Sequence, residues 1–133
     1  MNTGRYVTPS TWTAALAALF VAGAWFPPAA AQEAVSFKED VFPIIELRCL
    51  ECHQPGGSGY ETSGLDLRTY EGLMKGTKYG PVVAPRRPME SNFIAVIDHR
   101  TSPEIWMPHE RRGLSKCERL LVRFWVSQGA TDN

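Results

Sequence analysis

The spacing of hydrophobic residues predicts a chain made mainly of helices. Over 37–47, apolar residues recur at helical intervals. Ser36 and Glu39 have the spacing of a capping box, in which each side chain bonds the backbone amide of the other. Pro43 interrupts this pattern, because an interior proline removes a backbone hydrogen bond. The pattern therefore predicts a helix that either kinks at Pro43 or restarts there.

The clearest helix in the sequence is the last one. Ser115 and Glu118 have the spacing of a second capping box, and Gly129 is a favourable terminator. Helical periodicity between them predicts a buried stripe of Cys117, Leu120, Leu121, Phe124, Trp125 and Gln128. We therefore expect Cys117 to be a buried, inert thiol, with an intermolecular disulfide as the alternative.

Shorter helices are predicted between these two. Thr69 caps a short helix that ends at Gly76, and Pro88 occupies the first position of another. Clusters of glycine and proline predict loops over 54–64 and 99–113. No segment has a convincing strand pattern, so the predicted fold class is all-α with long loops.

The first 31 residues differ from the rest of the chain. Arg5 precedes a nearly unbroken apolar stretch over 12–26, and small residues follow up to Ala31. This order predicts a secretory signal peptide over 1–31 that is cleaved after Ala31. The alternative is an uncleaved membrane anchor, but a spanning helix needs about 20 apolar residues. We expect a single mature domain of residues 32–133, periplasmic or otherwise exported, without a membrane span.

Charge and cysteine content narrow the possible functions. The chain has 14 basic and 14 acidic residues, and Arg5 is the only charged residue in the predicted signal peptide. Such a balance does not support nucleic-acid binding or a polybasic membrane patch. The chain has three cysteines, of which Cys49 and Cys52 are clustered, and this does not fit a disulfide scaffold. The clustered pair therefore indicates a different use.

The cluster is the sequence Cys49-Leu50-Glu51-Cys52-His53, the C-x-x-C-H pattern of haem c attachment. Two thiols at this spacing can form thioethers with the two vinyl groups of one porphyrin, and the adjoining imidazole can ligate the iron. A thioredoxin-like motif belongs beside a βαβ pattern, and a zinc site needs a fourth ligand at a familiar spacing. Neither is present in the sequence. The motif predicts one covalently bound haem c, attached through Cys49 and Cys52, with His53 as an iron ligand.

An electron carrier fills the sixth coordination position of its haem iron with a side chain. The candidates are Met74, Met89, Met107, His99 and His109. Met107 is favoured because it lies in a proline-flanked irregular segment that can lay a thioether over the iron, and His109 is its main rival. We interpret Met74 as core filler and His99 as an ordinary surface side chain. Trp106, beside Met107, is expected to touch the porphyrin.

The sequence resembles planctomycete-type cytochrome c domains over nearly the whole predicted mature chain. The positions that carry the resemblance are Phe37, Asp40, Val41, Pro43–Ile45, Cys49, Cys52, His53, Gly64–Leu67, Gly76, Gly80, Pro81, Pro88, Glu90, Ser91, Met107, Pro108, Leu114, Ser115, Trp125, Val126, Gly129 and Ala130. The resemblance implies an all-α, class I-like cytochrome c domain whose terminal helices pack beside a covalently bound haem.

The resemblance also implies a role for individual residues. His53 would be the proximal ligand and Met107 the distal one. The carbonyl oxygen of Pro81 would accept the Nδ1 proton of His53 and so orient the imidazole. His109 departs from the family pattern, in which a second proline is usual after the methionine, and Cys117 lies outside that pattern.

The sequence therefore predicts a single-haem cytochrome that carries one electron at a time between redox partner proteins. It would act free or as a subunit of a larger oxidoreductase, and not as an enzyme itself. One alternative is a haem enzyme that activates a small molecule, although only His109 offers distal acid–base chemistry. The other alternative is a sensor in which a ligand displaces Met107. The sixth iron ligand separates these three hypotheses.

Overall fold

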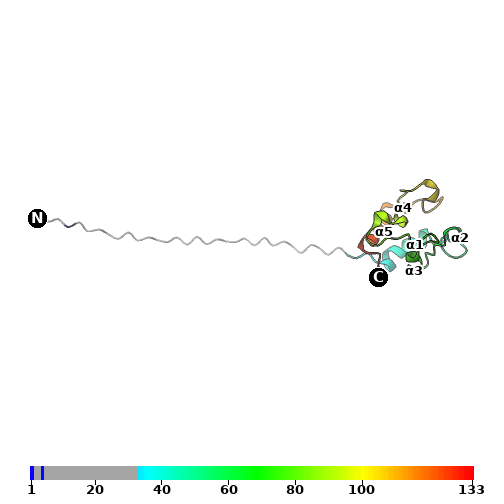
Figure 1. The fold of residues 1–133 in the computed structure, drawn as a ribbon, viewed down its shortest axis with the longest axis horizontal. Helices are drawn as coiled ribbons and strands as arrows, with labels where there is room; N and C mark the ends of the chain where they lie inside the picture. Colours follow the sequence, from blue (N-terminus) through cyan, green and yellow to red (C-terminus); the bar gives the residue numbers. More distant parts are fainter. Residues whose placement is uncertain (2–3, 5–32) are drawn as a thin grey trace. The chain divides into compact units, whose positions relative to one another are not determined.

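The computed structural model describes Met1, Gly4 and residues 33–133 (Figure 1). The predicted signal peptide lies almost entirely outside the described residues and stays a prediction. Among the residues that are described, no helix has the length and apolar character needed to cross a membrane.

The described part of the chain is helical. Its elements are η1 (Phe37–Val41), α1 (Phe42–Arg48), α2 (Ser58–Ser63), α3 (Tyr70–Lys75), η2 (Pro88–Glu90), α4 (Asn92–Ile97), η3 (Pro103–Ile105) and α5 (Lys116–Gln128). Within residues 33–133 the only extended pairing is one isolated bridge between Thr77 and Gly80. The predicted all-α class therefore agrees with the structure over these residues.

The helix predicted after Ser36 begins as the π-helical turn η1 and continues as α1. Pro43 lies in the first turn of α1, where a helix tolerates proline, so a new segment opens there. The Ser36 hydroxyl accepts a hydrogen bond from the Glu39 amide at 3.1 Å, as predicted. The return bond was predicted wrongly, because the Ser36 amide donates to the Asp40 carboxylate at 2.8 Å. The Val41 amide donates to the Ser36 carbonyl, as in a π-turn. This wider turn places the side chain of Asp40, rather than that of Glu39, next to the Ser36 amide.

The short central helices follow the predictions in part. Helix α3 has the predicted cap at Thr69 and ends at Gly76, whose φ is +81°. The single helix predicted from Pro88 is instead divided into η2 and α4. Ser91 causes the division, since its backbone is extended and its hydroxyl donates to the Arg87 carbonyl.

Helix α2 occupies a segment that was predicted to be a loop. The Ser63 hydroxyl donates to the Gly59 carbonyl at 2.6 Å, and Gly64 ends the helix with a left-handed φ of +74°. The loop prediction over 54–64 was wrong because it rested on the many glycines of this segment. The helix depends instead on contacts with the segment that precedes it.

The core joins the beginning of the described chain to its end. The rings of Phe37 and Trp125 lie 5.4 Å apart, and Tyr70 packs edge-on against Phe37 at 5.3 Å. The Tyr70 hydroxyl donates to the Ala130 carbonyl. Around these rings are the buried aliphatic residues Val41, Ile45, Leu65, Leu67, Leu73, Val83, Ile94, Ile97, Leu114, Val122 and Val126.

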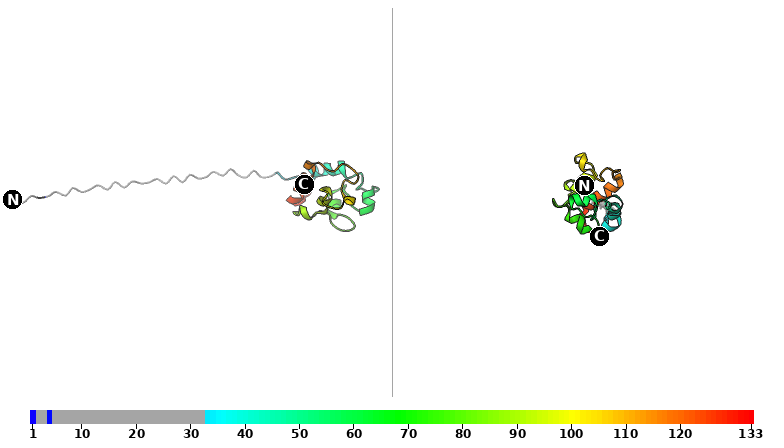
Figure 2. Two further views of the ribbon diagram at one scale, coloured as in Figure 1. Left: turned by 90° about the horizontal axis from the view of Figure 1, so that it is seen from above. Right: turned by 90° about the vertical axis from the view of Figure 1, so that its right-hand side faces the viewer.

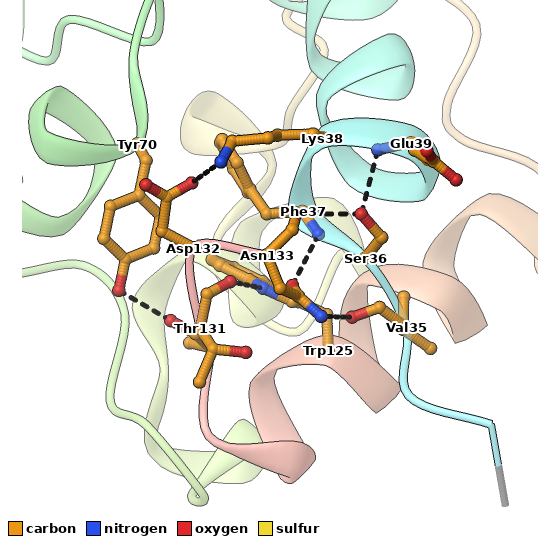
Figure 3. A network of polar contacts seen from close by, with 11 residues as sticks. Val35, Ser36, Phe37, Lys38, Glu39, Tyr70, Trp125, Thr131, Asp132 and Asn133 are labelled. Carbon is orange, nitrogen blue, oxygen red and sulfur yellow. Dashed lines mark hydrogen bonds and ion pairs between the residues drawn. The ribbon is translucent and has the colours of Figure 1, made fainter.

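Hydrogen bonds hold Asn133 against the start of η1 (Figure 3). The Lys38 amide donates to the Asn133 carbonyl at 3.1 Å, and the Phe37 amide donates to its side chain at 3.0 Å. Figure 2 shows the C-terminus beside the start of the described segment. Both ends of the described segment therefore pack together, while a position beside a haem stays a prediction.

Helix α5 has the predicted ends but buries only part of the predicted stripe. The Ser115–Glu118 capping box and the end at Gly129 are confirmed. The buried residues are Val122, Trp125 and Val126, whereas Leu120 and Phe124 are 38% and 42% exposed. Cys117 is exposed, so the prediction of a buried thiol was wrong. Two overlapping stripes of this helix have apolar periodicity, and packing against η1 selects the one formed by Val122, Trp125 and Val126.

The capping box at Ser115 makes a pH-dependent contribution to stability. Burial raises the pKa of Glu118, but hydrogen bonds from Ser115 and the charge of Arg48 outweigh burial and hold this pKa below its usual range. We expect Glu118→Gln to lower the free energy of unfolding by about 0.5 kcal/mol at neutral pH. Because the pKa is depressed in the folded protein, this contribution is lost as the pH falls below about 4.5. Urea unfolding should show a larger difference at about pH 7 than at about pH 3. An equal difference at both pH values would contradict this account.

Candidate functional site

The C-x-x-C-H motif forms a hydrogen-bonded turn directly after α1. The Cys49 amide donates to the Ile45 carbonyl at 2.8 Å and so extends the bonding pattern of the helix. The amides of Cys52 and His53 both donate to the Cys49 carbonyl, at 3.1 and 3.0 Å. One turn of backbone therefore carries both thiols and the imidazole.

Helix α2 and the segment after it fix the second half of this turn. The Cys52 carbonyl accepts from the Tyr60 amide, and the His53 carbonyl accepts from the Leu67 amide, both at 2.9 Å. Gly59 lies directly against the imidazole, since a Cβ there would be 2.8 Å from His53 Cε1. Sequence reasoning missed Gly59, because a glycine in a glycine-rich segment gives no sign of what it approaches.

The two motif thiols are half-buried and free. Burial raises the pKa of Cys49 to about 12, against the opposing charge of Arg48 and with smaller increases from Cys52 and Glu118. Cys49 is therefore a neutral thiol at physiological pH. Catalytic redox cysteines have the opposite property, a depressed pKa that makes them thiolates. This difference disfavours a thioredoxin-like use of the motif.

His53 is buried and in the form that ligates metals. Burial lowers the pKa of its imidazole, so the ring is neutral at pH 7. Its Nδ1 is buried and has no hydrogen-bond partner among the described residues. This is the nitrogen whose proton the Pro81 carbonyl was predicted to accept, and the other ring nitrogen, Nε2, is the one that could ligate iron. Two free thiols and a neutral imidazole on one turn fit haem c as the group that this site would hold.

The predicted contact between Pro81 and His53 is not present among the hydrogen bonds of the described residues. Pro81 is exposed and lies just after the Thr77–Gly80 turn. Val83, two residues later, is in the core. The proposed role of the Pro81 carbonyl stays a prediction.

Met107 lies in the segment between α4 and α5, drawn yellow to orange in Figure 1. Its side chain is half-buried and packs against the same core cluster as Cys49. Its amide donates to the Val96 carbonyl at 3.2 Å. The rival His109 is exposed, as is Met89, and Met74 is half-buried against the core.

Trp106 and His99 form a stacked pair next to Met107. Their ring centroids are 4.5 Å apart with an interplanar angle of 10°, and the indole Nε1 donates to the Thr101 carbonyl at 2.9 Å. A Cβ at Gly113 would lie 3.1 Å from His99 Cε1. His99 is therefore a half-buried side chain stacked on Trp106, and not a freely exposed one as its interpretation as a surface side chain implied.

The structure brings the Met107 segment next to the end of α1, where the motif begins. A cavity of about 190 Å³ lies between them. It is lined by Leu47, Arg48, Pro108, Arg111 and Arg112. Pro108, which follows Met107, and Arg48, which precedes Cys49, therefore line the same cavity.

Comparison with known proteins agrees with this geometry. Residues 49–110 match the protein-family model of planctomycete cytochrome c. This match, over just under half of the chain, agrees with the predicted family resemblance. The matched segment begins at Cys49 and includes His53, Pro81 and Met107. No curated protein and no solved structure matches the chain.

Proposed function

We propose that the protein is an exported, single-haem c-type cytochrome that carries one electron at a time between redox partner proteins. Cys49 and Cys52 would bind the haem covalently, and His53 and Met107 would ligate its iron. The observation that carries this proposal is the motif turn, which holds two free thiols and a buried, neutral imidazole together. The family match over the same residues supports it.

Each residue of the site has a distinct part in this function. Bound haem supplies an iron centre that gains and loses single electrons. The neutral imidazole of His53 keeps a lone pair available, because burial disfavours its protonation. The thioether of Met107 is a soft donor that favours the ferrous state and raises the reduction potential. With His53 and Met107 both ligating the iron, no position would be open for substrate.

Surface charge supports a partner with an acidic docking face. Although the chain is neutral overall, three arginines pair with one carboxylate at the end of α4, and a lysine lines the same hollow. The cations are Arg100, Lys116, Arg119 and Arg123, and the carboxylate is that of Asp98. They line a concavity of about 340 Å³, beside the exposed Leu120 and Phe124 of α5. Arginine and aromatic side chains are enriched where proteins dock.

Visible and near-infrared spectra, recorded with and without carbon monoxide, test the proposed function. We expect low-spin iron in both oxidation states and a sulfur-to-iron charge-transfer band in the ferric protein, because a thioether fills the sixth position. Carbon monoxide should bind slowly, because the Met107 thioether must first dissociate from the iron. Rapid binding by the native ferrous protein would instead favour the sensor or the enzyme.

A further inference from the structure

The segment that carries Met107 has little regular structure of its own. Between α4 and α5 the described chain forms one short turn, η3, and Met107 lies beyond it. The amide of Met107 bonds the Val96 carbonyl, which fixes the backbone on the approach to this residue. Contacts with other elements must therefore fix the backbone after it.

One such contact joins this segment to a variable position of the motif itself. Both terminal nitrogens of Arg111 donate to the two carboxylate oxygens of Glu51, each at 2.7 Å. Glu51 is one of the two residues between Cys49 and Cys52. The bidentate geometry fixes direction as well as distance.

A second contact joins the same segment to the residue immediately before the motif. The Arg48 guanidinium donates to the carbonyls of Arg112 and Gly113, at 2.8 and 2.9 Å. The Arg48 side chain is only 23% exposed, and its Nε lies 3.9 Å from the Glu118 carboxylate. Hydrogen bonds from a charged donor are stronger than those between neutral groups.

We propose that Arg48 and the Glu51–Arg111 pair are positioning residues that hold the Met107 segment against the haem-attachment turn. This inference rests on the proposed function, in which Met107 ligates the iron. The backbone is held at the Met107 amide and again at the Arg112 and Gly113 carbonyls, so the stretch that carries Met107 is tethered at both ends. A short tethered stretch loses less conformational entropy when its side chain binds than a long one does.

Loss of the Glu51–Arg111 pair is expected to have a smaller effect on iron ligation by Met107 than loss of Arg48. Arg111 and Glu51 are 49% and 72% exposed, so the pair is screened by solvent. Its loss should raise the fraction of molecules with Met107 off the iron by about two- to five-fold. Arg48 is partly buried and satisfies two backbone carbonyls, and its loss should raise that fraction by about ten-fold or more.

The experiment measures the rate at which carbon monoxide binds the ferrous, haem-loaded protein, because binding requires Met107 to leave. The variants are Arg48→Gln, Arg111→Gln and the charge-swapped double variant Glu51→Arg with Arg111→Glu. Arg87→Gln is the matched control, since it breaks an exposed ion pair with Glu90 on η2. Covalent haem content and the ferric charge-transfer band are recorded for each variant.

The expected result is faster carbon monoxide binding in Arg48→Gln and Arg111→Gln, a rate near that of the native protein in the swapped pair, and no change in Arg87→Gln. Native rates in both single variants, with a normal charge-transfer band, would overturn the inference and leave the proposed function intact. Absence of the band from the native protein would overturn the ligand assignment and the inference together. A variant without covalent haem would also count against a positioning role, since it would show that the residue is needed for attachment.

Discussion

Replacing Cys49 and Cys52 together by alanine is expected to yield a protein with no covalently bound haem. Both thiols lie on one hydrogen-bonded turn and are free, so the double variant removes both attachment points. Each single variant should keep one thioether. Mass spectrometry of the denatured protein measures the covalent adduct directly, and a haem stain of a denaturing gel provides an independent check.

The third cysteine provides a matched control for this experiment. Cys117 is also a free thiol, but it is exposed on α5 and lies outside the motif. Cys117→Ala should therefore carry the same covalent haem as the native protein. An adduct that survives the loss of Cys49 and Cys52, or that disappears with Cys117, would refute the assignment of the attachment residues.

Met107→Ala is expected to remove the sulfur-to-iron charge-transfer band, accelerate carbon monoxide binding and lower the reduction potential. The physical reason is that alanine cannot ligate iron, so the soft donor that favours Fe(II) is lost. The spectrum, the binding rate and a potentiometric titration measure these three effects.

Met89→Ala is the control for the methionine variant, because it makes the same chemical change at an exposed residue of η2. It should leave all three readouts unchanged. His109→Ala addresses the rival ligand. An intact band in Met107→Ala, or loss of low-spin iron in His109→Ala, would overturn the assignment of Met107.

Helix ends were predictable where one residue and its near neighbours determine them. The cap at Thr69, the terminator Gly76 and the capping box at Ser115 were all found as predicted, because their hydrogen bonds span only a few residues. The buried face of α5 was not predictable in this way. Its periodicity allows two faces, and the choice depends on packing against Phe37, far away in the sequence.

The residues of the candidate site were likewise predictable only where they are neighbours in the sequence. The C-x-x-C-H motif is contiguous, so the sequence alone predicts haem attachment at these residues. Gly59 and the Glu51–Arg111 pair were missed, because each acts through a residue that only the fold brings close. A sequence with balanced charge offers many possible partners for each arginine, and spacing alone cannot select among them.

The mass of the purified, denatured native protein, together with its pyridine haemochrome spectrum, tests the central claim most directly. The account predicts the mass of residues 32–133 plus one haem, with the spectrum of a porphyrin whose two vinyl groups are both saturated. A colourless protein with the mass of the bare polypeptide would contradict it.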